Sequence, residues 1–174
     1  MRVIIHMIIT ANGMITGKDG ATSFISKKAS AEFLRMMGEV RANLVGSGTY
    51  KETLVHGSFP YPGLNVVMTR KKVKSRWKNV IFTDKGPREA LYIFKKHGIN
   101  TVMVGGGKIN SAFMKENLVD ELYLSIEPAV LTEGIKLFDG ADFKAKLRLL
   151  GVRRLSNGVV QLHYKVVKQN RSKA

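Results

Sequence analysis

The chain has 174 residues, 44% of them hydrophobic, which is enough to bury one substantial core and favours a single domain. It contains no cysteine, which excludes disulfides and thiolate nucleophiles, and no apolar run of about 18 residues, which excludes a membrane-spanning helix. A formal net charge of +16, from 29 Lys and Arg against 13 Asp and Glu, attracts polyanions, including nucleic acids and phosphorylated cofactors.

The first predicted strand covers Arg2–Thr10, an apolar run with His6 set among isoleucine and methionine. This run lacks the length and the cleavage site of a signal peptide, so we expect a cytoplasmic protein. Asn12-Gly13 predicts a turn, and Ser26 suits the N-cap of a helix over Lys27–Val40, whose apolar side chains form one face.

A short predicted strand, Asn43–Val45, ends at the glycine-bearing sequence Gly46-Ser47-Gly48-Thr49. A short helix or turn over Tyr50–Leu54 follows it. The glycines at this strand end let the backbone approach a ligand closely.

Two more predicted strands, Leu64–Thr69 and Val80–Phe82, come next in the chain. Arg70 lies at the carboxyl end of the first of them and opens a basic cluster. Pro87 suits the first turn of a helix over Arg88–Lys96, which Gly98 would end.

A second glycine-bearing strand end comes after Thr101–Val104, where Gly105, Gly106 and Gly107 stand in a row. A helical pattern over Lys108–Asn117 and a strand over Leu122–Ile126 follow, so the segment predicts a βαβ unit. The helix start behind the glycines offers free N–H groups and a partial positive charge, to which Lys108 adds a full charge. This pattern favours an anion site, most simply for a phosphate.

The C-terminal part predicts a β-hairpin, because Leu147–Leu155 and Val159–Val167 flank Ser156-Asn157-Gly158. We expect one domain over residues 1–168 and a frayed tail at 169–174. Strands that alternate with helices and then end in an antiparallel pair indicate an α/β domain with a mostly parallel sheet of about eight strands.

Three polar strand ends should converge in such a sheet, because ligands bind beyond the carboxyl ends of parallel strands. They are Gly46–Thr49, Thr69-Arg70 and Gly105–Lys108. Together they supply backbone amides, hydroxyls, an arginine and a lysine, which suit a ligand with several phosphates, such as NADP.

Four motifs in the same order are similar to those of the dihydrofolate reductase superfamily, in particular the riboflavin-biosynthesis reductase found as the C-terminal domain of the bacterial bifunctional deaminase–reductase. The motifs are GSGTY at Gly46–Tyr50, the run Pro62–Arg70, VGGGKI at Val104–Ile109 and the run Leu118–Pro128. The resemblance covers residues 2–168. It implies a three-layer fold, with helices on both faces of an eight-stranded sheet, and a homodimer.

The resemblance also implies that NADPH lies across the strand ends. Gly46–Thr49 and Gly105–Ile109 would hold the pyrophosphate, Thr69 and Arg70 the adenosine end, and Thr10 and Ile15 the nicotinamide. Ser47 replaces the arginine that is usual after the first glycine, which leaves NADH possible. The resulting cofactor site comprises Thr10, Ile15, Gly46, Ser47, Gly48, Thr49, Thr69, Arg70, Gly105, Gly106, Gly107, Lys108 and Ile109.

The substrate side differs from that of the folate enzymes, which carry an acid on the first helix, whereas this chain has none there before Glu32. His6 matches a polar position of the pyrimidine reductases and is the candidate proton donor, although a buried structural histidine is the alternative. Ser26, Ser30 and Ser125 are the other candidate substrate-binding residues. Ser26 can instead cap its helix, and Ser125 can instead bond within its sheet. No histidine has metal-ligand spacing, so no metal is expected.

The sequence therefore predicts an NAD(P)H-dependent reductase of a small, phosphorylated heterocycle such as a pyrimidine ribotide. Dihydrofolate reduction is the alternative within the class. The alternative from another class is nucleic-acid binding, which the basic clusters Arg70–Lys78 and Lys165–Lys173 would allow, although no nucleic-acid motif accompanies them.

Overall fold

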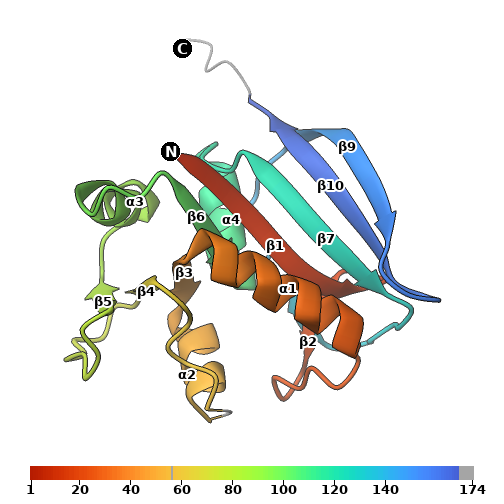
Figure 1. Ribbon diagram of the computed structural model, residues 1–174, viewed down its shortest axis with the longest axis horizontal. Coiled ribbons are helices and arrows are strands. Elements are labelled where there is room, and N and C mark those ends of the chain that lie inside the picture. The colour runs from red at the N-terminus through yellow and green to blue at the C-terminus, as the bar shows by residue number, and fades with distance from the viewer. Residues whose placement is uncertain (56, 169–174) are drawn as a thin grey trace.

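A computed structural model describes residues 1–55 and 57–168, and the predicted frayed tail lies outside these ranges. The described residues fold around one eight-stranded sheet, with a second sheet of two strands (Figure 1). The strands are β1 (Arg2–Thr10), β2 (Met14–Gly17), β3 (Ala42–Gly46), β4 (Leu64–Met68), β5 (Val80–Thr83), β6 (Thr101–Gly105), β7 (Glu121–Glu127), β8 (Gly134–Lys136), β9 (Lys146–Arg154) and β10 (Val160–Val167). The helices are α1 (Lys27–Val40), α2 (Ser47–Val55), α3 (Pro87–Lys96) and α4 (Gly107–Lys115).

The large sheet has the strand order β5-β4-β3-β6-β1-β7-β10-β9. The pairs from β5 to β7 are parallel, whereas β10 runs antiparallel to β7 and β9 antiparallel to β10. The predicted α/β class, with a mostly parallel sheet and a terminal hairpin, is therefore confirmed. Strands β6 and β7 of the predicted βαβ unit flank β1, which is buried along most of its length because it lies between them.

Side chains of the sheet alternate between two apolar layers, as the two-residue period of a strand requires. Ile5 of β1 faces a core that contains Phe94 of α3 and Phe113 of α4. Ile4 faces the opposite side, where Met36 and Met37 of α1 cover it. In Figure 1, α1 crosses in front of the sheet and α4 lies behind it, which gives the three layers expected. None of the helices among the described residues combines the length and the apolar content that crossing a membrane requires.

Helix α1 has the bounds that the sequence predicts, and its cap is the predicted one. The hydroxyl of Ser26 accepts a hydrogen bond from the Ala29 amide at 3.3 Å. The Ser26 amide in turn donates to the buried Glu127 carboxylate at 2.9 Å, which ties the start of the helix to the end of β7.

The small sheet of β2 and β8 is the main feature that the sequence pattern missed. Both strands are short, four and three residues, and β2 directly follows the turn predicted at Asn12-Gly13, so neither showed a periodic pattern. They pair closely: a Cβ on Gly134 would lie 2.0 Å from the Thr16 carbonyl oxygen, so only glycine fits there. The other difference is at Ser47-Gly48-Thr49, which forms the first turn of α2 instead of a loop.

Candidate active site

A cavity of about 870 Å³ lies along the carboxyl edge of the parallel strands, a volume typical of ligand sites. The three predicted strand ends meet there, because β3, β4 and β6 are neighbours in the sheet. The cofactor-site candidates that line it are Ile15, Gly46, Ser47, Gly48, Thr49, Thr69, Arg70, Gly105, Gly106, Gly107, Lys108 and Ile109. The structure therefore confirms that the three predicted strand ends lie together at one cavity.

Two helices begin at this cavity, each directly after a glycine at the end of a parallel strand. Helix α2 starts at Ser47 after β3, and α4 starts at Gly107 after β6. No side chain among the described residues caps α4, so its first amides are left to bind another acceptor. Both helix starts therefore carry a partial positive charge toward the cavity, an arrangement that favours anions.

Two glycines of the second motif lie so close to neighbouring parts of the chain that a side chain would not fit. Gly106 has φ +106°, and a Cβ on it would lie 2.9 Å from the Thr49 hydroxyl oxygen. A Cβ on Gly107 would lie 2.5 Å from the Lys136 carbonyl oxygen. This narrow cradle of backbone amides fits a diphosphate, which needs close approach of the main chain and no negative side chain between its oxygens.

Charged side chains are distributed unevenly around the cavity. Arg70, Lys85 and Lys108 line the end nearest β4, β5 and α4. The sequence pointed to Arg70 and Lys108, whereas Lys85 was missed because it lies two residues beyond its short strand. Four acids also line the cavity, and none had been predicted: Asp19, Glu52, Asp84 and Asp139.

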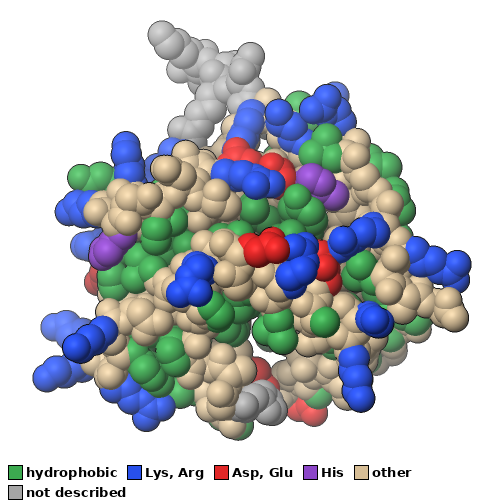
Figure 2. All heavy atoms as spheres, in the orientation of Figure 1, with side chains coloured by type: hydrophobic (Ala, Val, Ile, Leu, Met, Phe, Trp, Pro, Cys, Tyr) green, Lys and Arg blue, Asp and Glu red, His purple; other side chains and the backbone are tan. Residues whose placement is uncertain are grey.

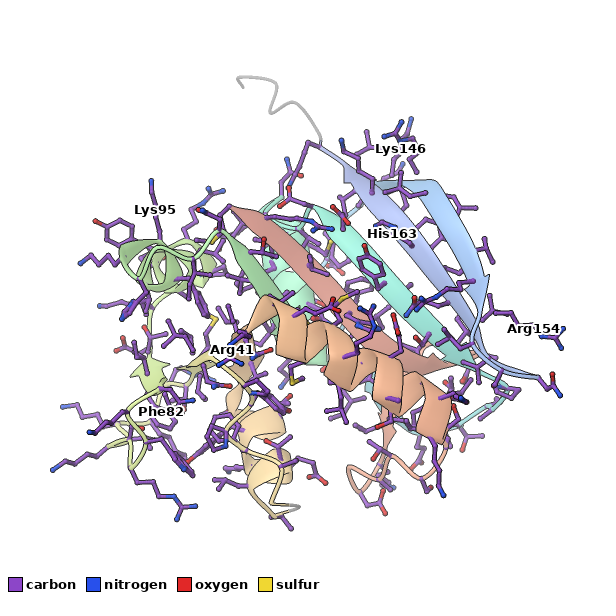
Figure 3. The ribbon with its side chains drawn as sticks, in the orientation of Figure 1. Arg41, Phe82, Lys95, Lys146, Arg154 and His163 are labelled. Atoms are coloured by element: carbon purple, nitrogen blue, oxygen red, sulfur yellow. The ribbon has the colours of Figure 1, made fainter. Side chains whose placement is uncertain are left out.

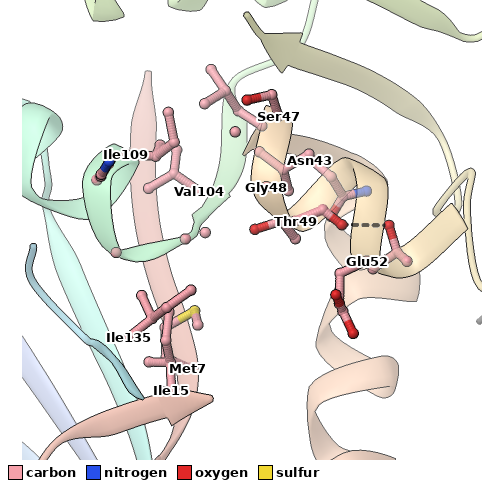
Figure 4. Close-up of a pocket in the computed structure, with 18 of the residues that line it drawn as sticks. Met7, Ile15, Asn43, Ser47, Gly48, Thr49, Glu52, Val104, Ile109 and Ile135 are labelled. Carbon is pink, nitrogen blue, oxygen red and sulfur yellow. Dashed lines mark hydrogen bonds between the residues drawn. The ribbon is translucent and has the colours of Figure 1, made fainter. Parts of the chain in front are cut away.

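Apolar side chains form the part of the cavity below the glycines (Figure 4). Met7 and Ile15 lie on one side, together with Ile135, and face Val104 across the glycine turn. Only Ile15 was predicted. Met7 was predicted only as an apolar residue of the first strand, and Ile135 belongs to β8, which the sequence did not reveal.

Two predicted substrate residues, His6 and Ser30, line the cavity beside Phe33 and Tyr61. Three other predicted residues, Thr10, Ser26 and Ser125, are not part of the described lining. The Thr10 hydroxyl donates to Asn12 Oδ1 at 2.7 Å and accepts from the Met14 amide at 3.0 Å, so it holds the turn into β2. Ser125 Oγ accepts from Gln161 at 3.2 Å. Ligand contacts of all five residues remain predictions.

His6 is almost completely buried, 1% exposed, beneath the ring of Phe33 at a centroid distance of 5.3 Å. Burial lowers its pKa to about 4, so the imidazole is neutral at pH 7. Its Nε2 lies 3.3 Å from Gln161 Nε2, and its Nδ1 has no hydrogen-bond partner among the described residues.

Glu32, the first acid of α1, does not reach this cavity. Arg35 binds it through two hydrogen bonds, of 3.0 and 2.8 Å, and Arg153 of β9 forms a salt bridge with it. Hydrogen bonds from Arg35 and then from Arg153 lower the pKa of this carboxyl to about 2. Glu32 lines a separate polar cleft on the same face of the sheet, so it is not placed to serve a ligand beside His6.

Comparison with known families supports the arrangement of these strand ends, because the model of the RibD C-terminal domain matches residues 1–161. The chain belongs to the RibD C-terminal domain family. It is 28% identical over 172 residues to the uncharacterised protein YwjB of Bacillus subtilis, covering 94% of this chain and 97% of that protein.

Solved structures of RibD C-terminal domain relatives share the fold. A protein of Shewanella sp. PV-4 superposes with a TM-score of 0.84 at 19% identity, covering 96% of this chain and 99% of that one. The diaminohydroxyphosphoribosylaminopyrimidine deaminase/5-amino-6-(5-phosphoribosylamino)uracil reductase of Thermotoga maritima superposes with a TM-score of 0.77 at 19% identity. There the match covers 95% of this chain and 56% of the other, so this RibD C-terminal domain corresponds to about half of that protein.

Proposed function

We propose that this protein is an NADPH-dependent reductase that delivers hydride to a small heterocyclic substrate. The observation that carries the proposal is the pair of glycine turns at the starts of α2 and α4, which line one cavity with Arg70 and Lys108 beside them. When bound, NADPH would supply the hydride.

The chain's own groups would bind and orient the two reactants. Amides at Gly46–Thr49 and Gly105–Ile109 would hold the diphosphate, and Thr69 with Arg70 the adenosine end. Met7, Ile15 and Ile135 would exclude water from the reducing ring. The free volume beside His6, Ser30 and Tyr61 would hold the substrate. Positioning and water exclusion can account for much of the rate in such a site.

For the substrate we propose a pyrimidine ribotide of the 5-amino-6-(5-phosphoribosylamino)uracil type, in riboflavin biosynthesis. Membership of the RibD C-terminal domain family and the activity named for the Thermotoga relative support this choice. Dihydrofolate is the weaker candidate, because Glu32 is bound by Arg35 and Arg153 away from the cavity. Following NADPH absorbance with each compound in turn separates the two.

The cofactor proposal is tested by titrating NADPH and NADH into the protein and following nicotinamide fluorescence. Gly106→Ala should weaken NADPH binding at least about tenfold, because the new methyl group meets the Thr49 hydroxyl at a strained φ. Gly38→Ala is the control, because a Cβ there meets no described atom within 4 Å in the interior of α1. A wild-type protein that binds neither nucleotide would refute the proposal.

Nucleic-acid binding is the competing function that the net charge of +16 raises. On the face drawn in Figure 2, Lys and Arg side chains are scattered, mostly toward the rim, and do not form one patch. Gel retardation at increasing salt tests this alternative, because polyanion binding of this kind weakens steeply with ionic strength.

A homodimer also remains a proposal, and β9 is the surface on which we expect it. This edge strand exposes Leu147, Leu149 and Val152 on the same face. In a protein of charge +16, two copies repel least where apolar residues meet. Sedimentation should give a dimer for the wild type and a monomer for Leu149→Asp; a monomeric wild type would remove the proposal.

A further inference from the structure

A continuous set of polar contacts connects the exposed cleft beside α1 with the substrate end of the cavity. It runs from Glu32 through Arg153 and Gln161 to His6, and so joins α1, β9, β10 and β1. Each step is a contact between side chains of two different secondary-structure elements. The direction of every hydrogen bond in the set follows from the chemistry of its first members.

The orientation of the Gln161 amide is determined by its arginine neighbour. Arg153 Nη2 lies 3.1 Å from one end of the amide, and a guanidinium can only donate, so that end is the oxygen Oε1. The amide nitrogen therefore points the other way, to within 3.2 Å of Ser125 Oγ and 3.3 Å of His6 Nε2. Its two N–H groups match these two acceptors.

The amide in turn determines the tautomer of His6. Because Gln161 donates to His6 Nε2, that nitrogen carries no proton, and the single proton of a neutral imidazole must be on Nδ1. Burial lowers the pKa of the ring and keeps it neutral. The charge of Glu32 raises this pKa, whereas the charges of Arg35 and Arg153 lower it, so their effects partly cancel. Phe33 and Tyr123 cover its faces, with centroids at 5.3 and 5.9 Å.

The Nδ1–H group is then a buried donor without a partner among the described residues, on a ring that lines the cavity. An unmet buried donor costs free energy, which a ligand acceptor would recover. We propose that Gln161, oriented by Arg153 and Glu32, holds His6 as a neutral Nδ1–H donor for a carbonyl oxygen or ring nitrogen of the bound substrate. This rests on the proposed function for the identity of the substrate, and it makes His6 a hydrogen-bond donor and Gln161 and Arg153 positioning residues.

The tautomer can be observed directly, without cofactor or substrate, by correlating ring nitrogens and protons in protein labelled with ¹⁵N-histidine. Wild-type His6 should show the neutral Nδ1–H form between about pH 5 and pH 8. Gln161→Glu should remove that form in favour of Nε2–H or the charged ring, because a carboxylate accepts where the amide donated. Arg153→Met should give a mixture of tautomers, since the Gln161 amide can then flip and exchange the positions of its oxygen and nitrogen.

Two controls separate this effect from a general disturbance. Arg148→Ala, exposed on the same strand as Arg153 but paired with Lys165 instead of Gln161, should leave the His6 signals unchanged. His163, labelled in Figure 3, stacks on Tyr123 at 3.9 Å and lies 2.7 Å from Glu121, so His163→Gln identifies the second histidine signal of this face.

A wild-type ring in the Nε2–H or charged form at pH 7 would overturn the proposal, even if Gln161→Glu failed to fold. With NADP⁺ present, 5,6-diaminouracil should shift the wild-type Nδ1 proton signal but not that of Gln161→Glu; an unshifted wild-type signal at saturation would also refute the assigned role. Gln161→Glu should lower kcat/KM about tenfold. Failure of NADPH binding would refute the proposed function and leave the tautomer measurement intact.

Discussion

The two ends of the cavity are built in different ways. The end assigned to the cofactor consists mainly of backbone, at strand ends that pass directly into α2 and α4. The end assigned to the substrate consists of side chains held by other side chains, with His6, Gln161, Arg153 and Glu32 coming from four elements. The first is constrained at Gly106 and Gly107, where a methyl group has no room, and the second is specific because each hydrogen bond constrains the next.

The sharpest test of the backbone end is Gly107→Ala. The added Cβ would lie 2.5 Å from a main-chain carbonyl oxygen, so we expect a loss of about 1–3 kcal/mol in the free energy of unfolding and weaker NADPH binding. Gly48→Ala, whose Cβ meets no described atom within 4 Å, should leave stability nearly unchanged or raise it. Urea unfolding of both variants measures this, and equal effects would show that the close approach is not what demands glycine.

A smaller effect is expected from Arg70→Ala at the edge of the same end. Loss of a charge-assisted contact should weaken NADPH binding about tenfold and NADH binding less, if Arg70 meets the 2′-phosphate. Lys72→Ala, in the same basic cluster but outside the lining of the cavity, is the control. Fluorescence titration at two salt concentrations measures both affinities. An equal loss of affinity for NADPH and NADH would show that Arg70 does not contact the 2′-phosphate.

The smallest effect concerns the side-chain end and depends on pH. The pKa of Glu32 is lowered to about 2 from 4.5, so its stabilising contribution is complete above about pH 4.5 and is lost as pH falls toward 2. Glu32→Gln should therefore be less stable than the wild type by about 1 kcal/mol at pH 7, with the difference shrinking below pH 4.5.

Urea midpoints at pH 7, 4.5, 3 and 2 measure that difference. Glu39→Gln is the matched control, because Glu39 also meets Arg35 on α1 but is exposed, where ion pairs contribute little. A difference that stayed constant down to pH 2 would show that the ionised Glu32 carboxylate is not what Arg35 and Arg153 stabilise.

The order of strands and helices and the glycine end of the site could be predicted from the sequence, because they depend on local patterns. Alternating apolar residues, the Ser26 cap and the Asn157-Gly158 turn each act within a few residues. The convergence of Gly46–Thr49 with Gly105–Ile109 followed from a general property of parallel sheets, whose carboxyl ends share one edge.

Only the tertiary structure decided the other end of the site. Gln161 is 155 positions from His6, and no spacing in the chain announces their contact. Ile135 lines the cavity from a strand of three residues, which is too short for a periodic signal. Glu32 lies outside the cavity, in a salt bridge with Arg153 of β9. Backbone periodicity is a local property of the chain, whereas the partner of a buried polar group is chosen among side chains that folding alone brings together.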